Sequence, residues 1–274
     1  RLHHQAHPIP GDKTPLLIQL NHPLGIQFWP DKAHRTDAHG LFEELQFKRE
    51  LPLELQSDER FLKHLKSNNK SIISFDAIEV LNRFSIAGWR AVRLDWFALL
   101  NRGHRITGTG NADSHSSQLE AIGFPVNLVE AHAGDTGGFV EAIRSGKVRV
   151  SSGPLVDLTV RCGDVELHPS HAVARVAEPC EAEVHVQAAS WVPVDEVRLV
   201  VNGEVYRRES IGSFGADTRF RFPLPRGRDL WVLAEAGWPL ERDGRPEEGL
   251  YARIAPGHVP IGFTNPVWLR PEAH

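Results

Sequence analysis

The feature of this sequence that most constrains its fold is a change of pattern near Gly153. Before this residue, short apolar runs of strand length alternate with stretches at helical spacing. After it, short segments of alternating apolar residues recur and are separated by turn-forming residues. A chain that changes its period in this way is expected to build two different kinds of layer. We therefore predict two domains, 1–152 and 153–274.

The first part is predicted to be an α/β domain with parallel strands. The expected strands cover 16–20, 76–81, 105–109, 126–131 and 147–151, and the expected helices cover 58–66, 95–102 and 138–145. Asp95 is expected to cap the second helix and Gly103 to end it. In parallel α/β folds, functional groups collect at the carboxyl ends of the strands. Candidate site residues are therefore sought there.

The second part is predicted to be an antiparallel β-sandwich. The expected strands cover 155–160, 182–188, 196–201, 218–222 and 230–234. Asn202-Gly203 between two of them is a strong signal for a two-residue hairpin. Cys162 and Cys180 are the two cysteines of the chain. A disulfide and two free thiols are both compatible with the sequence.

Bulk composition excludes some functions. The 274 residues carry a formal net charge of −4, so there is no global basic field that would attract nucleic acid. No apolar run approaches the roughly 20 residues of a membrane span. The compartment, cytoplasmic or secreted, is left open. The chain has no methionine, so we expect that either an upstream segment or residues within the chain are absent from this sequence.

The segment GTGNADSHSS, residues 108–117, carries the most informative chemistry. It places Asp113 and His115 two residues apart directly after a predicted strand, and Gly108 and Gly110 would permit close backbone approach. Carboxylate and imidazole are ligands of zinc, manganese and iron. An ordinary polar turn is the alternative interpretation, because Asn, Asp and Ser favour turns.

Two further polar residues accompany predicted strands. His22 follows an apolar strand and precedes a proline, where a packing role is the usual alternative to a ligand role. Glu79 lies inside an apolar strand, and a buried carboxylate needs a hydrogen-bonding or ionic partner. The remaining histidines lie in loops or polar surroundings and are expected at the surface.

Taken in order, these motifs resemble a known family. They are Asn-His-Pro at 21–23, IEVLN at 78–82, DWFALLN at 95–101, GTGNADSH at 108–115 and GKVRVSSGP at 146–154. The set is similar to the C-terminal two-thirds of the PHP-domain metallohydrolases (polymerase and histidinol phosphatase type), in the group that includes a carbaryl hydrolase. Ser190-Trp191-Val192-Pro193 and Thr264-Asn265-Pro266 are similar to the tail domain of that group.

The resemblance implies a distorted seven-stranded (β/α) barrel holding two or three divalent ions, followed by the sandwich. It makes His22, Asp113 and His115 metal ligands and catalytic residues, and it places Glu79, Asn82 and Asn111 around them. The implied reaction is hydrolysis by metal-activated water of a phosphate ester, or of a carbamate, carboxylic ester or amide. The substrate would be a small molecule. Several family ligands have no counterpart here, so the upstream segment is expected to complete the site.

A non-catalytic binding protein is the alternative function. In that case the sandwich, which contains Trp191, Trp231, Trp238 and Trp268, would bind carbohydrate or another partner on a degenerate barrel. Tryptophans packed in the core would be the ordinary alternative to a binding surface.

Overall fold

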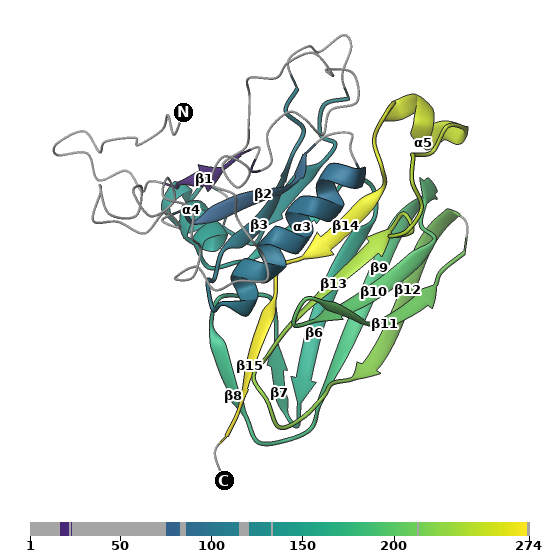
Figure 1. Ribbon diagram of the computed structural model, residues 1–274. Coiled ribbons are helices and arrows are strands. Elements are labelled where there is room, and N and C mark those ends of the chain that lie inside the picture. Colours follow the sequence, from purple (N-terminus) through teal and green to yellow (C-terminus); the bar gives the residue numbers. More distant parts are fainter. Residues whose placement is uncertain are drawn as a thin grey trace, which may run out of the picture.

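The computed structural model describes residues 17–21, 23, 75–82, 86–114, 121–132, 134–212 and 214–272. These residues form a mixed α/β structure that is mostly sheet with few helices and includes a curled half-barrel sheet (Figure 1). The helix expected over 58–66 lies outside the described residues.

Three parallel strands form one sheet in the order β1-β2-β3. They are β1 (Gln19–Leu20), β2 (Ala77–Asn82) and β3 (Thr107–Asn111). Helices α3 (Ile86–Asn101) and α4 (Thr136–Arg144) accompany this sheet. Trp96 of α3 meets the Gly108 side of β3, whereas the Thr107 hydroxyl donates to the carbonyl of Ile143 in α4 at 2.5 Å. Because successive strand residues face opposite sides, the two helices lie on opposite faces of the sheet.

Helix α3 begins earlier than the sequence indicates. Asp95 was expected at its N-cap but lies in its interior and is buried, so that expectation was wrong. The end of the helix was predicted correctly. Gly103 follows the last turn with φ 85°, and its N–H donates to the carbonyl of Leu100 at 2.9 Å.

The expected arrangement of the fourth and fifth strands was also wrong. Strands β4 (Val126–Val129) and β5 (Val148–Ser151) were expected to continue the parallel sheet. They instead pair antiparallel with each other, and β5 pairs antiparallel with β14 (Ile261–Thr264). With so few helices and only three strands in the parallel sheet of the described residues, the structure does not support a (β/α) barrel.

The remaining strands build two sheets that face each other. The larger sheet has eight strands: β4, β5, β14, β8 (Val173–Val176), β10 (Glu196–Val201), β11 (Glu204–Ser210), β13 (Leu230–Gly237) and β15 (Val267–Pro271). The smaller sheet has the order β12-β9-β6-β7: β12 (Phe214–Pro223), β9 (Cys180–Pro193), β6 (Leu155–Cys162) and β7 (Val165–Leu167). Neighbouring strands are antiparallel, apart from the parallel pair β8–β15. A short helix, α5 (Gly249–Ile254), precedes β14.

The larger sheet is a middle layer, because β10 and β13 are buried along their whole length. Val232 and Ala234 face the smaller sheet, within a core that includes residues of β6 and β9. Trp231 and Leu233 face the other side and pack in the same core as α3 and β2. That second core includes residues from both sides of position 152, and the sheet itself crosses this position through β5 and β14. The division into two domains stays a prediction.

Two local features of the sandwich have a simple physical basis. Asn202 and Gly203 both have positive φ, 49° and 91°, and join β10 to β11, so the hairpin prediction is confirmed. Cys162 of β6 lies directly opposite Cys180 of β9, and the two form a disulfide. The question that the sequence left open is thereby answered.

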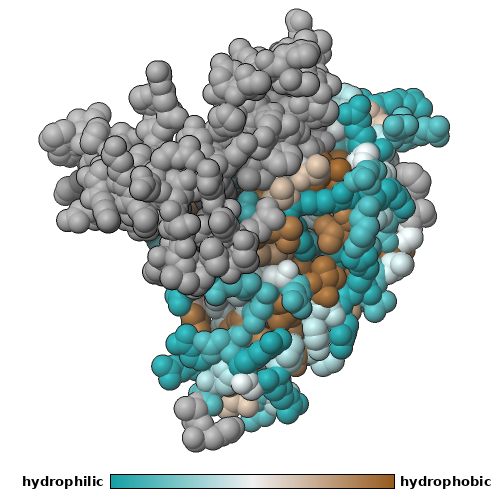
Figure 2. Space-filling model, viewed as in Figure 1, coloured by the Kyte–Doolittle hydropathy of each residue, from teal (hydrophilic) through white to brown (hydrophobic). Residues whose placement is uncertain are grey.

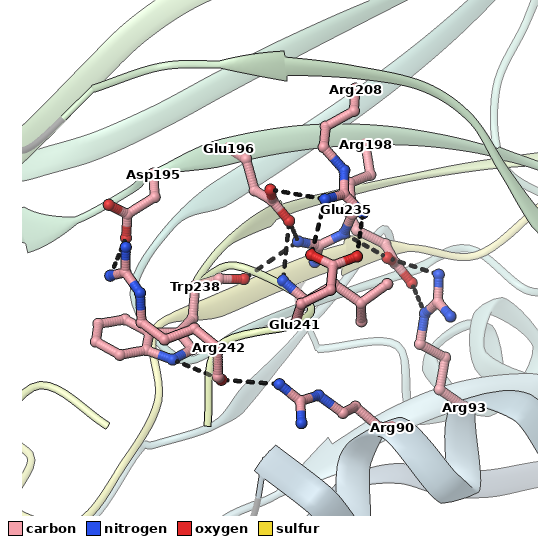
Figure 3. Close-up of polar contacts among 11 residues, drawn as sticks. Arg90, Arg93, Asp195, Glu196, Arg198, Arg208, Glu235, Trp238, Glu241 and Arg242 are labelled. Atoms are coloured by element: carbon pink, nitrogen blue, oxygen red, sulfur yellow. Dashed lines mark hydrogen bonds and ion pairs between the residues drawn. The ribbon is translucent and has the colours of Figure 1, made fainter. Parts of the chain in front are cut away.

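A cluster of buried charges joins α3 to the middle sheet (Figure 3). Arg93 of α3 donates to both carboxylate oxygens of Glu235 on β13, at 2.5 and 3.0 Å. Arg198, directly opposite Glu235 on β10, donates to the same carboxylate at 3.0 Å and also pairs with Glu196. Burial alone would raise the pKa of Glu235, but Arg93 and Arg198 outweigh it and hold the pKa below its usual value. Both guanidinium groups also lie 5.6 Å from the ring of Trp89.

Apolar surface is spread over several elements. On the face shown in Figure 2, brown patches lie among hydrophilic residues. The exposed large apolar residues of the described chain include Leu94 on α3, Phe139 on α4 and Val165 on β7. Such scattered exposure is ordinary for a folded protein.

Candidate functional site

The carboxyl edge of the parallel sheet gathers three of the polar residues that the sequence singled out. Strands β2 and β3 end side by side, because Asn82 and Asn111 are partners in the parallel register. Asp113 follows β3 by two residues. The two strands therefore deliver Asn82, Asn111 and Asp113 to the same edge.

A row of hydrogen-bonding side chains crosses the three strands near this edge. Glu79 of β2 is only 2% exposed, and the Asn111 amide donates to its carboxylate at 2.9 Å. The Thr109 hydroxyl of β3 lies 3.1 Å from the side-chain oxygen of Gln19 in β1. The Gln19 amide donates in turn to the Asn21 side chain at 2.6 Å. Polar contacts thus continue from β3 to the residue that follows β1.

Asp113 has an unusual backbone conformation, with φ 47°. Asparagine and aspartate are several-fold enriched among non-glycine residues in this left-handed region. The chain therefore turns sharply after β3 while still presenting a carboxylate. The sequence allows two interpretations of this segment, a polar turn and a metal-ligand position. Asp113 can form the turn and still offer its carboxylate as a ligand.

Close packing explains the two glycines that precede the turn. A Cβ at Gly108 would lie 2.7 Å from the Trp96 ring of α3. A Cβ at Gly110 would collide with Val150 of β5 and lie 3.0 Å from Pro125. The expected close approach at both glycines is confirmed, and it comes from an aromatic ring and a neighbouring strand.

The described residues do not by themselves form a metal site. Asp113 and Glu79 supply carboxylates, and amide oxygens surround them, which suits divalent cations. No group of three or more His, Cys, Asp or Glu side chains able to hold a metal occurs within the described ranges. His22 and His115 lie outside the described residues, each one position beyond a described neighbour in the sequence. The described set alone does not fit a complete metal centre.

Three of the four tryptophans considered for a binding surface are buried. Trp231, Trp238 and Trp268 are between 3% and 9% exposed, and Trp191 is half-buried against Tyr251. The core interpretation is confirmed for the first three. They do not form an exposed aromatic platform, which removes the observation that favoured a carbohydrate-binding sandwich.

Several polar residues differ from their sequence-based assignment or were not singled out. His258 was expected at the surface but is 1% exposed, in contact with the ring of Phe124. His171 is half-buried, and burial together with nearby Arg105 lowers its pKa to about 4. Asn127 and Asn265, which bind the backbone of β3, were overlooked as site residues. Asn127 stands between valine and leucine in a strand, the same signal that identified Glu79.

Comparison of this chain with known proteins identified no similar protein. No family model, curated protein or solved structure matches this chain. In the described part of the chain, no helix combines the length and apolar character that crossing a membrane requires.

Proposed function

We propose that this chain carries part of the active site of a metal-dependent hydrolase at the carboxyl edge of β1–β3. The observation that supports the proposal best is the convergence of Glu79, Asn111 and Asp113 on one edge of a parallel sheet. Carboxylate and amide oxygens are ligands that divalent cations prefer. A cation-binding role at this edge would explain why the strands end in such residues.

In this proposal Asp113, His22 and His115 hold divalent ions of zinc, manganese or iron. Such ions lower the pKa of a coordinated water and polarise the scissile bond when they are bound. The amide of Asn111 remains tied to Glu79, so its carbonyl oxygen has a fixed direction at the edge. Asn82, the neighbour of Asn111 in the parallel register, borders the same position. The substrate class is a phosphate ester, a carbamate, or a carboxylic ester or amide.

A complete barrel of the distorted seven-stranded kind belongs to the same proposal. It would require further parallel strands beside β1, because side chains of Asn127 and Asn265 occupy the other edge of β3. This proposal has three linked parts: the resemblance to the PHP family, the ligand set and the need for an upstream segment. Evidence against one part would count against the other two.

The decisive test compares Asp113→Asn with the unchanged full-length protein. Asparagine tolerates the left-handed backbone of this position, so the substitution removes charge with little added strain. The proteins are loaded with zinc or manganese, bound metal is measured by mass spectrometry, and turnover is assayed on a panel of phosphate, carbamate and carboxylic esters. We expect the Asp113→Asn protein to lose its bound metal. Its kcat/KM should fall by more than about 100-fold, which exceeds the usual effect of replacing an outer-shell residue.

Asp164→Asn is the matched control, because this aspartate is exposed in the turn between β6 and β7. It should leave metal content and turnover unchanged. If the unchanged protein retains no metal, or if Asp113→Asn is as active as Asp164→Asn, the proposed function is wrong.

A further inference from the structure

Strand β3 has one edge without a partner strand in its own sheet. Its other edge pairs with β2, and the described sheet ends at β3. The backbone N–H and C=O groups of Gly108 and Gly110 point to this unpaired edge. Unpaired backbone groups in the interior are costly, so something other than a strand must satisfy them.

Two asparagine side chains do so. The Asn265 amide accepts from the Gly108 N–H at 2.8 Å and donates to the Gly108 carbonyl at 3.0 Å. The Asn127 amide accepts from the Gly110 N–H at 2.9 Å and donates to the Gly110 carbonyl at 2.7 Å. Each carboxamide therefore makes the pair of hydrogen bonds that a residue of a neighbouring strand would make.

The two asparagines come from the larger sheet and connect it to β3. Asn127 is a residue of β4, and Asn265 follows β14 directly. Asn265 is fully buried and also donates to the carbonyl of Val148 on β5 at 2.9 Å. Asn127 is exposed on its other side, so a change there would leave the apolar cores intact.

Asn127 acts next to the candidate site. Gly110, the residue that it binds, precedes Asn111, and Asn111 contacts Glu79. Asp113 follows three residues after Gly110. The two hydrogen bonds of Asn127 restrain the last part of β3 before the chain turns. They lie on the side of β3 away from β2.

We propose that Asn127 is a positioning residue that fixes the 111–113 segment, and that Asn265 anchors the strand one step earlier. The part of this proposal that concerns metal binding and turnover rests on the proposed function. The hydrogen bonds link the antiparallel sheet to the candidate site, so this sheet sets the placement of Asp113 without contributing a ligand.

The test uses Asn127→Leu, which has the same branching and number of side-chain heavy atoms but can make neither bond, in the full-length protein. Asn127→Asp is the conservative variant, because it keeps the acceptor for the Gly110 N–H and loses the donor. Glu130→Ala, exposed and just beyond β4, is the control. Hydrogen exchange of the amides at 110–113, thermal unfolding, manganese affinity and kcat/KM are measured for each protein.

We expect Asn127→Leu to speed exchange at 110–113 by roughly tenfold or more and to weaken manganese binding by roughly 10–100-fold, as removal of an outer-shell partner does. Asn127→Asp should keep the slow exchange of the Gly110 amide, and Glu130→Ala should match the unchanged protein. Unaltered exchange in Asn127→Leu would overturn the proposal. Faster exchange with unaltered manganese affinity would also overturn it, since the role would then be structural only.

The two proposals fail in different ways. If the unchanged protein neither binds metal nor hydrolyses any ester, the proposed function is wrong. The exchange data still decide whether Asn127 fixes the 111–113 segment, because they require neither metal nor substrate.

Discussion

Arg93 and Glu235 are separated by 142 positions in the sequence and meet in two hydrogen bonds between α3 and β13, with both side chains at most 5% exposed. Arg198 adds a second guanidinium to the same carboxylate. Because buried ions are tolerated only when they are paired, this carboxylate is what allows two arginines to lie between the helix and the sheet.

Replacement of Glu235 should therefore destabilise the fold strongly. Glu235→Gln leaves two buried guanidinium groups without their shared anion, and we expect a loss of about 3–5 kcal/mol in the free energy of unfolding. Urea unfolding followed by circular dichroism measures it. Glu241→Gln, which breaks the exposed pair with Arg208, should cost less than about 1 kcal/mol. Equal losses for the two variants would contradict the assigned importance of burial.

His171 should make stability depend on pH. Its pKa is lowered to about 4 by burial and by Arg105, while in the unfolded chain it returns to 6.5. Between these values the unfolded state binds the extra proton, so stability is complete above about pH 6.5 and declines as the pH falls towards 4. The loss attributable to this residue is at most about 3 kcal/mol.

His171→Gln removes the titrating group and should flatten this part of the stability profile. The measurement is the midpoint of urea unfolding at half-unit steps between pH 4 and pH 7. His168→Gln, whose ring is exposed, is the control and should keep the slope of the unchanged protein. A His171→Gln profile as steep as the control profile would assign the slope to other groups.

Gly110→Ala should disturb the candidate site through a steric clash. The added Cβ would collide with Val150 and crowd Pro125, and overpacking of this kind costs about 1–3 kcal/mol. The double variant Gly110→Ala with Val150→Ala makes room for the new methyl group. It should regain manganese affinity relative to the single variant, and this gain separates the clash from a general loss of stability.

Gly137→Ala on α4 provides the control for glycine replacement. Its Cβ would meet the nearest atom, a carboxylate oxygen of Asp135, at an ordinary 3.4 Å. Alanine also favours helix more than glycine does. The control should be neutral or slightly more stable, and its manganese affinity should not change. If the double variant does not regain manganese affinity, Gly110 is needed for a reason other than the space that a Cβ would occupy.

The Cys162–Cys180 disulfide should contribute to stability by an amount that depends on the length of the chain it closes. The two residues are 18 positions apart, and a loop of this length corresponds to about 3 kcal/mol in the chain-entropy estimate. We expect the unchanged protein to lose about this much in urea when a reductant is added. The Cys162→Ser, Cys180→Ser double variant should be insensitive to the reductant, and a matching response in both proteins would refute the assignment.

The sequence predicts where strands form better than how they pair. Apolar runs and turn residues correctly indicate β2, β3, β10 and the Asn202-Gly203 turn, because these signals are local. The run at 126–129 fits a parallel or an antiparallel strand equally well. Its antiparallel partner β5 also pairs with β14, which is more than 100 residues away.

Long-range contacts also explain the errors at α3 and at the candidate site. Arg93 and Asp95 interrupt the apolar spacing of the helix, and the partner of Arg93 lies on β13. The helix therefore looks shorter in the sequence than it is. Glu79 stands out because a carboxylate in an apolar strand is unusual. Asn127 and Asn265 are ordinary polar residues until the edge of β3 is seen to need them.

The core that packs α3 against Trp231 and Leu233 has a consequence for how such a protein can unfold and evolve. A helix contributed by the first half of the chain packs in one core with strands of both halves. Heating should therefore melt both halves in a single cooperative transition. By the same logic, a recombination event that exchanged the sandwich alone would leave α3 without its counterpart, so the two halves are expected to be inherited as one unit.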